Sequence, residues 1–213
     1  MSKIRFTEPN REILARRDSI INDLTRLVDP AGLITSTDEC RAYETDALTA
    51  YRKMPLAVVL PKTTEEVSAV LKYCHDTGVK VVPRGAGTSL AGGAIPSEDA
   101  VVLGLSKMNR VLAVNYDDRF IRVEAGVTNL SVTAVVAENG FFYAPDPSSQ
   151  LACTIGGNIA NNSGGAHCLK YGVTTNNLLG VRMVLIDGSI IDLGGDYLDS
   201  AGLDLLGLVV GSE

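Results

Sequence analysis

Residues 83–94, PRGAGTSLAGGA, are the part of this chain best suited to binding a phosphate group. The four glycines of this stretch let the backbone approach a ligand closely, and successive amides in such a loop can cradle phosphate oxygens. Thr88 and Ser89 add hydroxyl donors. Taken alone, the stretch fits either a phosphate loop or an ordinary tight turn.

Two common phosphate motifs do not fit these residues. The loop of nucleoside triphosphatases needs a Lys followed by Ser or Thr after its glycines, and no Lys is present here. The dinucleotide fingerprint G-x-G-x-x-G would need glycine at position 90, which is Leu90. The loop therefore predicts neither a triphosphatase nor a nicotinamide-dinucleotide site.

A second glycine-rich segment covers residues 144–172 and contains five glycines and three asparagines. Its only Asp, Glu, Lys or Arg residues are Asp146 and Lys170. A compact domain seldom carries so long an irregular segment without a function, and its apolar residues argue against a disordered linker. Two separate amide-rich loops suit a ligand with a pyrophosphate and a large planar group. FAD and a sugar nucleotide both fit that description.

The elements that must position these loops begin with a strand–helix–strand unit. Residues 55–61 form an apolar run bounded by prolines, which predicts a buried strand. A helix is expected over 64–77, with a capping box formed by Thr63 and Glu66 and a stop at Gly78. The next strand, 79–83, leads directly into the first loop. This order predicts a βαβ unit with a parallel pair of strands.

The rest of the chain favours antiparallel structure. We expect a strand at 100–106, hairpins over 110–126 and 180–195, a helix over 128–140 and a short helix within 203–211. The fold class is therefore α+β. A small parallel βαβ subdomain (about 51–106) would pack on a larger, mostly antiparallel subdomain with helices (about 107–213). Residues 1–50 would form an accessory segment with a helix over 11–27.

Bulk composition narrows the possible partners. The net charge of −6, from 19 basic and 25 acidic residues, argues against nonspecific nucleic-acid binding. No apolar run reaches the roughly 18 residues of a membrane span, and the first residues lack the apolar core of a signal peptide. The four cysteines form no C-x-x-C pair, so no metal site is predicted. A cytoplasmic location is expected, at most peripheral to a membrane through partner subunits.

Four stretches together resemble the FAD-linked oxidase family, whose FAD-binding domain is of the vanillyl-alcohol-oxidase type. They are residues 83–94, residues 144–165 (APDPSSQLACTIGGNIANNSGG), residues 167–172 (HCLKYG) and the terminal LLGLVVGSE. In that family, FAD lies between a small α/β subdomain and a larger α+β subdomain. The resemblance is strongest to the flavoproteins that oxidise 2-hydroxy acids such as glycolate or D-lactate by hydride transfer to flavin N5. It implies an oxidoreductase that acts on CH–OH groups.

The resemblance also implies roles for individual residues. Arg84 would either add positive charge to the phosphate loop or serve as a packing arginine. The pyrophosphate would be held by Gly85, Ala86, Gly87, Thr88 and Ser89. The rest of the cofactor would lie along Pro145, Asp146, Thr154, Gly156, Gly157, Asn158, Ser163, Gly164 and Gly172, with Val181 at the adenine end.

Thr88 occupies the position at which some relatives carry a histidine bonded covalently to FAD, so noncovalent FAD is expected. The pattern of the family continues past Glu213, and we expect the catalytic residues beyond that position and this chain alone to be inactive. His167, Tyr171 and Arg52 fit roles near the flavin or substrate less well than packing or surface roles.

The implied partners are a small 2-hydroxy acid and further oxidase subunits, including an iron–sulfur subunit. Two alternatives remain at this point: a non-catalytic FAD-binding subunit of a larger complex, and a UDP-sugar reductase of the same broad fold.

Overall fold

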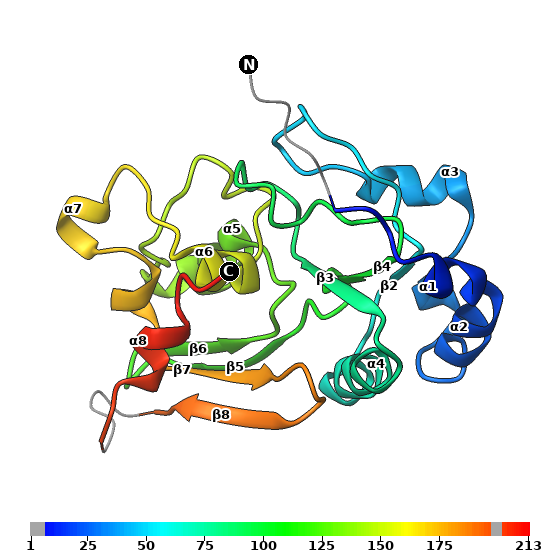
Figure 1. Cartoon of the computed structure of the whole chain (residues 1–213). Coiled ribbons are helices and arrows are strands. Elements are labelled where there is room, and N and C mark those ends of the chain that lie inside the picture. The colour runs from blue at the N-terminus through cyan, green and yellow to red at the C-terminus, as the bar shows by residue number, and fades with distance from the viewer. Residues whose placement is uncertain (1–6, 197–201) are drawn as a thin grey trace.

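The first half of the chain builds a four-stranded sheet that carries the first glycine-rich loop (Figure 1). The computed structural model describes residues 7–196 and 202–213. In the sheet order β1-β2-β4-β3, β1 is antiparallel to β2 and the other pairs are parallel. The strands are β1 (Leu33–Ile34), β2 (Ala57–Val59), β3 (Lys80–Arg84) and β4 (Ala100–Gly104).

The predicted parallel strands are present, but β2 and β3 are not neighbours because β4 lies between them. Every residue of β4 is buried, whereas β3 exposes Lys80 and Pro83. The two strands whose residues are all buried, β2 and β4, thus occupy the interior of the sheet, as parallel sheets require.

Helix α4 (Thr64–Thr77) connects β2 to β3 and has the predicted ends. The Thr63 side chain accepts the Glu66 amide, and Gly78 ends the helix with φ +74°. The predicted capping box is only half formed, because the Glu66 carboxylate accepts the amide of Lys62, at 2.7 Å, instead of the Thr63 amide. The position of the helix therefore follows from local sequence.

Apolar residues between Ile13 and Val28 belong to the core of the same sheet. The expected helix over 11–27 is divided at Arg16 into α1 (Arg11–Ala15) and α2 (Arg17–Leu24). Ile20 and Leu24 of α2 are fully buried and pack with the apolar side of α4 on one face of the sheet. The other face is covered by residues of α3 (Thr37–Cys40) and η2 (Arg41–Tyr43), and η1 (Pro30–Gly32) precedes β1.

The second half of the chain contains two antiparallel hairpins and several short helices, so the α+β fold class is confirmed. The hairpins are β5 (Val111–Asn115) with β6 (Phe120–Val123), and β7 (Gly180–Val184) with β8 (Ile190–Gly194). The helices are α5 (Asn129–Val136), η3 (Ala137–Asn139), α6 (Ile155–Asn161), α7 (Cys168–Tyr171), η4 (Thr174–Asn177) and α8 (Leu205–Val209).

The prediction that residues 144–172 are irregular was wrong over α6 and α7. Ile155 and Ile159 are spaced four residues apart, so both fall on one helix face, where they pack with Val127 and Val132. Thr154 caps this helix by accepting the Gly157 amide at 3.2 Å. Tertiary packing thus overrides the low helix propensity of glycine and asparagine.

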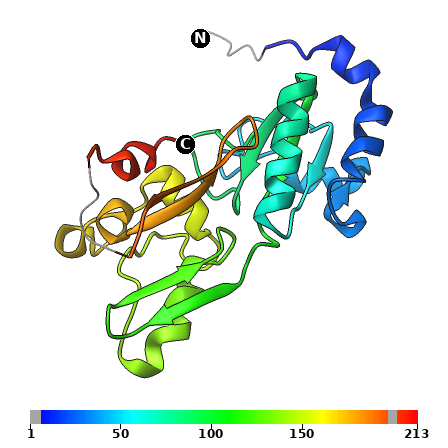
Figure 2. The same cartoon turned by 90° about the horizontal axis from the view of Figure 1, so that it is seen from below.

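The β7–β8 turn joins the two halves. The Ser68 hydroxyl of α4 donates to the carbonyl of Gly188 at 2.5 Å, and Figure 2 shows this hairpin reaching toward α4. Gly188 has φ +85°, and a Cβ there would lie 2.7 Å from the Ser68 carbonyl oxygen. Within the described ranges, no helix is both long and apolar enough to cross a bilayer.

Candidate cofactor site

The two glycine-rich segments meet along helix α6. A Cβ at Gly85 would lie 2.6 Å from the Thr154 hydroxyl and 3.7 Å from Cα of Gly157, so only glycine permits this approach. Farther along the loop, the Ser89 hydroxyl donates to Oδ1 of Asn161 at 3.4 Å. The first loop therefore follows α6 from its beginning to its end.

The backbone amides at the centre of the first loop are available to a ligand. Within residues 7–196 and 202–213, the amides of residues 86–90 donate no hydrogen bond to the protein. The Thr88 hydroxyl is half-buried beside them. Adjacent free amides and a hydroxyl can bind phosphate oxygens without a lysine.

Arg84 lies inside the loop, against Gly87. Its Nη1 donates to the carbonyl of Thr45 at 2.7 Å, and its guanidinium carbon lies 5.6 Å from the centre of the Tyr43 ring. The side chain is buried, and this burial lowers the pKa of Arg84. These contacts favour the packing role of Arg84 over the phosphate-binding role.

The second segment is folded back on itself by Asp146. The Asp146 carboxylate accepts the amide of His167 at 3.2 Å and contacts Nδ1 of its ring at 2.5 Å. Gly165 lies so close to Asp146 that a Cβ there would overlap it. The neighbouring carbonyl of Pro145 accepts from the buried amide of Asn129 at 2.9 Å. Hydrogen bonds from His167 lower the pKa of Asp146.

Asn158 is the unusual residue of α6. It is 1% exposed, and neither Oδ1 nor Nδ2 has a hydrogen-bond partner in the described structure. A buried amide without a partner is uncommon and calls for an explanation. It lies in the helix that both loops contact.

The other predicted residues have mixed surroundings. The Ser163 carbonyl accepts both the amide and the hydroxyl of Thr174, at 2.9 and 2.7 Å. Gly164 approaches the side chain of Val173, Gly172 has φ +77°, and Gly156 donates to the Ala125 carbonyl at 2.8 Å. Val181 lies in β7, and among the described residues no hydrogen bond connects it to either loop.

The C-terminal residues form a further side of this site, as their position over α6 in Figure 1 shows. The amides of Gly211 and Glu213 donate to the carbonyls of Ile159 and Ala160, at 2.8 and 3.0 Å. A Cβ at Gly93 would lie 2.7 Å from the Glu213 carboxylate. The end of the chain thus connects α6 to the first loop.

Sequence reasoning missed Asp46, which contacts the first loop from the N-terminal segment. The Asp46 carboxylate accepts the amides of Leu48 and Gly92 at 2.8 and 3.0 Å. The contact with Leu48, two residues on, is a local turn that Thr-Asp-Ala-Leu could have suggested. No pattern in the neighbouring sequence predicts the contact with Gly92, which lies 46 positions away.

A cleft of about 460 Å³ opens beside the point where Gly85 meets Thr154. It is lined on its other sides by residues that follow β6 and by residues of α5, including Gly126, Val127 and Ser131. Among residues 7–196 and 202–213, no His, Cys, Asp or Glu side chains are grouped so that they could hold a metal ion.

Comparison with known proteins identifies the class. Residues 55–194 match the FAD binding domain family, which covers more than half of the chain. The chain therefore belongs to this family, and FAD is its cofactor. The surroundings of α6 fit that cofactor: free amides and hydroxyls suit a pyrophosphate, and a bound group at α6 would satisfy the Asn158 amide.

Two curated relatives are similar to most of this chain. Glycolate oxidase subunit GlcD of Escherichia coli (strain K12) is 49% identical over 197 residues, covering 92% of this chain and 40% of the relative. D-lactate dehydrogenase of Archaeoglobus fulgidus is 40% identical over 197 residues, covering 92% of this chain and 43% of the relative. The chain thus spans about 40% of the length of these relatives.

A solved structure of alkyldihydroxyacetonephosphate synthase has the same fold, with a TM-score of 0.81 at 22% identity. The match covers 98% of this chain and 39% of that one. The predicted family, fold class and cofactor are confirmed. The roles assigned to individual site residues stay predictions.

Proposed function

We propose that this chain is the FAD-binding part of a flavin-dependent oxidase or dehydrogenase of 2-hydroxy acids such as glycolate or D-lactate. The observation that carries the proposal is the meeting of the two glycine-rich segments on α6, in a chain 49% identical to a glycolate oxidase subunit. When bound, FAD supplies an acceptor for the hydride that leaves the hydroxyl-bearing carbon.

The residues of the chain would divide the binding of FAD among them. The amides of residues 86–90 and the hydroxyls of Thr88 and Ser89 would hold the pyrophosphate. The backbone at Pro145 and the carboxylate of Asp146, which His167 holds in place, would border the flavin. The side-chain amide of Asn158 would bind a polar group of the cofactor. Thr88 has no ring nitrogen able to bond the flavin, so FAD would be held noncovalently.

The first experiment tests FAD binding. Purified chain is titrated with FAD while the flavin fluorescence is recorded, and binding of about one FAD per chain is expected. Acid precipitation should then release all flavin into the supernatant. Absence of binding contradicts the proposal, and flavin that stays with the precipitate contradicts noncovalent attachment.

The second experiment tests the substrate class. Because the chain spans about 40% of GlcD, turnover is measured separately from binding. FAD-loaded protein, alone and within its native complex, is mixed anaerobically with glycolate, D-lactate or a UDP-sugar, and loss of flavin absorbance is followed. Reduction by a 2-hydroxy acid supports the proposal. Reduction by none of them in the complex favours a non-catalytic FAD-binding subunit.

Further subunits are part of the proposal. The relative GlcD is by name one subunit of glycolate oxidase, which supports a multi-subunit oxidase here as well. We include an iron–sulfur subunit and a cytoplasmic location, peripheral to the membrane at most. Affinity purification of the native protein followed by mass spectrometry tests for further subunits, and iron analysis of the purified complex tests for the iron–sulfur subunit.

A further inference from the structure

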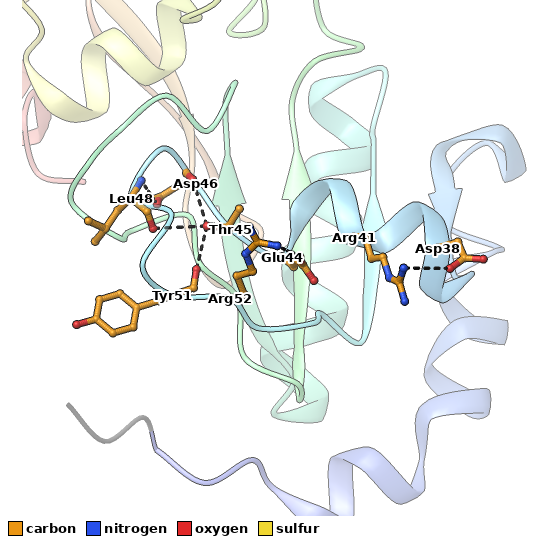
Figure 3. A network of polar contacts seen from close by, with 8 residues as sticks. All are labelled: Asp38, Arg41, Glu44, Thr45, Asp46, Leu48, Tyr51 and Arg52. Carbon is orange, nitrogen blue, oxygen red and sulfur yellow. Dashed lines mark hydrogen bonds and ion pairs between the residues drawn. The ribbon is translucent and has the colours of Figure 1, made fainter. Parts of the chain in front are cut away.

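A turn at residues 45–48, drawn in Figure 3, lies against the first glycine-rich loop, and the Asp46 carboxylate connects the two. The Asp46 carboxylate is 4% exposed and accepts two backbone amides. One belongs to Leu48 of the same turn, at 2.8 Å, and the other to Gly92 of the loop, at 3.0 Å. A buried carboxylate with two amide donors fixes both segments in one arrangement.

The same turn holds the beginning of the loop through Arg84 and Gly87. Arg84 donates to the Thr45 carbonyl at 2.7 Å, and the Ala47 amide donates to the Gly87 carbonyl at 2.9 Å. Gly87 has φ +70°, and a Cβ there would overlap the Arg84 guanidinium. Gly87, whose backbone is in the left-handed region, is therefore held by Arg84 on one side and by the Ala47 amide on the other.

The turn itself is held together by hydrogen bonds of the Thr45 hydroxyl. Figure 3 shows the Thr45 hydroxyl at its centre, where it donates to the carbonyl of Tyr51 at 2.9 Å. The turn and the loop are 39 to 46 positions apart in the sequence, so no local tendency of the chain creates this contact.

These contacts fix the carbonyl of Gly87 and the amide of Gly92 but leave the amides of residues 86–90 free. A loop that is ordered before its ligand arrives loses less conformational entropy on binding. We infer that Asp46 and Arg84 are positioning residues of the FAD site, which hold residues 85–92 in the binding conformation through the turn at 45–48. This inference rests on the proposed function for the identity of the ligand.

The first test compares two acidic residues of the same segment. Asp46→Asn keeps the shape but loses the charge and one acceptor, whereas Asp38→Asn changes an exposed carboxylate that contacts only Arg41 in Figure 3. We expect the Kd for FAD to rise roughly tenfold or more in Asp46→Asn, because a hydrogen bond to a charged group is lost. Asp38→Asn should leave the Kd unchanged. Equal Kd values in both variants would overturn the inference.

The second test distinguishes positioning by Arg84 from direct phosphate binding. In Arg84→Met both the charge and the flat guanidinium beside Gly87 are lost, while an apolar side chain of similar length is kept. We expect weaker FAD binding with an unchanged dependence of the Kd on salt concentration. A flatter salt dependence would identify Arg84 as a phosphate contact and overturn its assignment.

A third measurement needs no variant and decides the case if Asp46→Asn does not fold. Hydrogen exchange of the unaltered chain is recorded by NMR with and without FAD. The amides of Ala47 and Gly92 should exchange slowly in both states, and those of residues 86–90 should become slow only with FAD. If Ala47 and Gly92 exchange as fast as residues 86–90 without FAD, the inference is overturned. If the chain binds no FAD, the proposed function fails, while exchange at Ala47 and Gly92 still reports on the turn.

Discussion

The carboxylate of Asp146 and the imidazole of His167 lie 2.5 Å apart, although 21 positions separate them in the chain. A second hydrogen bond, from the His167 amide, supports the same contact. This pair closes the second glycine-rich segment around Gly165, at a place where no side chain would fit. The lone histidine of that segment is thus a structural partner of Asp146 in the free chain.

Replacing His167 by Ala should raise the pKa of Asp146 toward its ordinary value of 3.8, because the hydrogen bond of the His167 ring, which Ala removes, is the largest cause of the lowering. A pKa lowered by folding means that the contact stabilises the segment above about pH 4 and is lost as the pH falls through the lowered value. Side-chain carbon NMR of Asp146 measures the shift. Cys168→Ser, next to the pair, is the control, and an unmoved pKa in His167→Ala refutes the assigned contact.

Replacing Asn158 by Leu should have opposite effects on stability and binding. A buried amide without partners costs about 1–3 kcal/mol, so its removal should leave the free energy of unfolding of the free chain equal or higher. FAD affinity should fall because the amide is lost from the site. Asn129 is the matched control: it is also 1% exposed but donates to Pro145, so Asn129→Leu should lower the free energy of unfolding. Urea unfolding with and without FAD checks both, and a destabilised Asn158→Leu free chain contradicts the argument.

Replacing Gly85 by Ala should separate the first loop from α6. The new methyl group would lie 2.6 Å from the Thr154 hydroxyl, so the loop or the helix cap must move. We expect a loss of FAD affinity of at least roughly tenfold, since both walls of the site shift. Gly140→Ala provides the control, because it also strains the chain, at φ +79°, but has open space around it. Fluorescence titration of both variants decides, and equal affinities would argue against the contact.

The stability of the chain should fall in acid because of Asp99. Burial alone would raise its pKa, but hydrogen bonds from Lys80, Ser97 and the Asn10 amide lower it to about 2. Asp99 therefore stabilises the fold fully above about pH 4 and loses this effect as the pH falls toward 2. The shift corresponds to about 2 kcal/mol.

Asp99→Asn tests this expectation. The variant should be less stable at pH 7 by about 2 kcal/mol and should lose the pH dependence between about 4 and 2. Urea unfolding at several pH values measures both quantities. Asp118→Asn, in the exposed β5–β6 turn, serves as the control. A pH dependence that survives in Asp99→Asn would point to another carboxylate.

Much of the architecture could be predicted from local sequence. The apolar run at 55–61 predicts β2, Thr63 and Gly78 predict the ends of α4, and Asp187-Gly188 predicts the turn between β7 and β8. Each of these features depends on residues only a few positions apart. The cofactor class could be predicted too, because the loop at 83–94 and the segment at 144–165 are contiguous family motifs.

The sequence by itself determined strands β2 to β8, the ends of α4, the family and the cofactor, because residue propensities, helix caps and family motifs each depend on residues close together in the chain. The tertiary structure alone decided that β4 lies between β2 and β3, that α6 forms inside a glycine-rich segment, and that Arg84 faces Thr45. It also brought Asp46 to Gly92 across 46 positions. These features depend on burial and on hydrogen bonds between distant residues, whose energies exist only once the chain has folded.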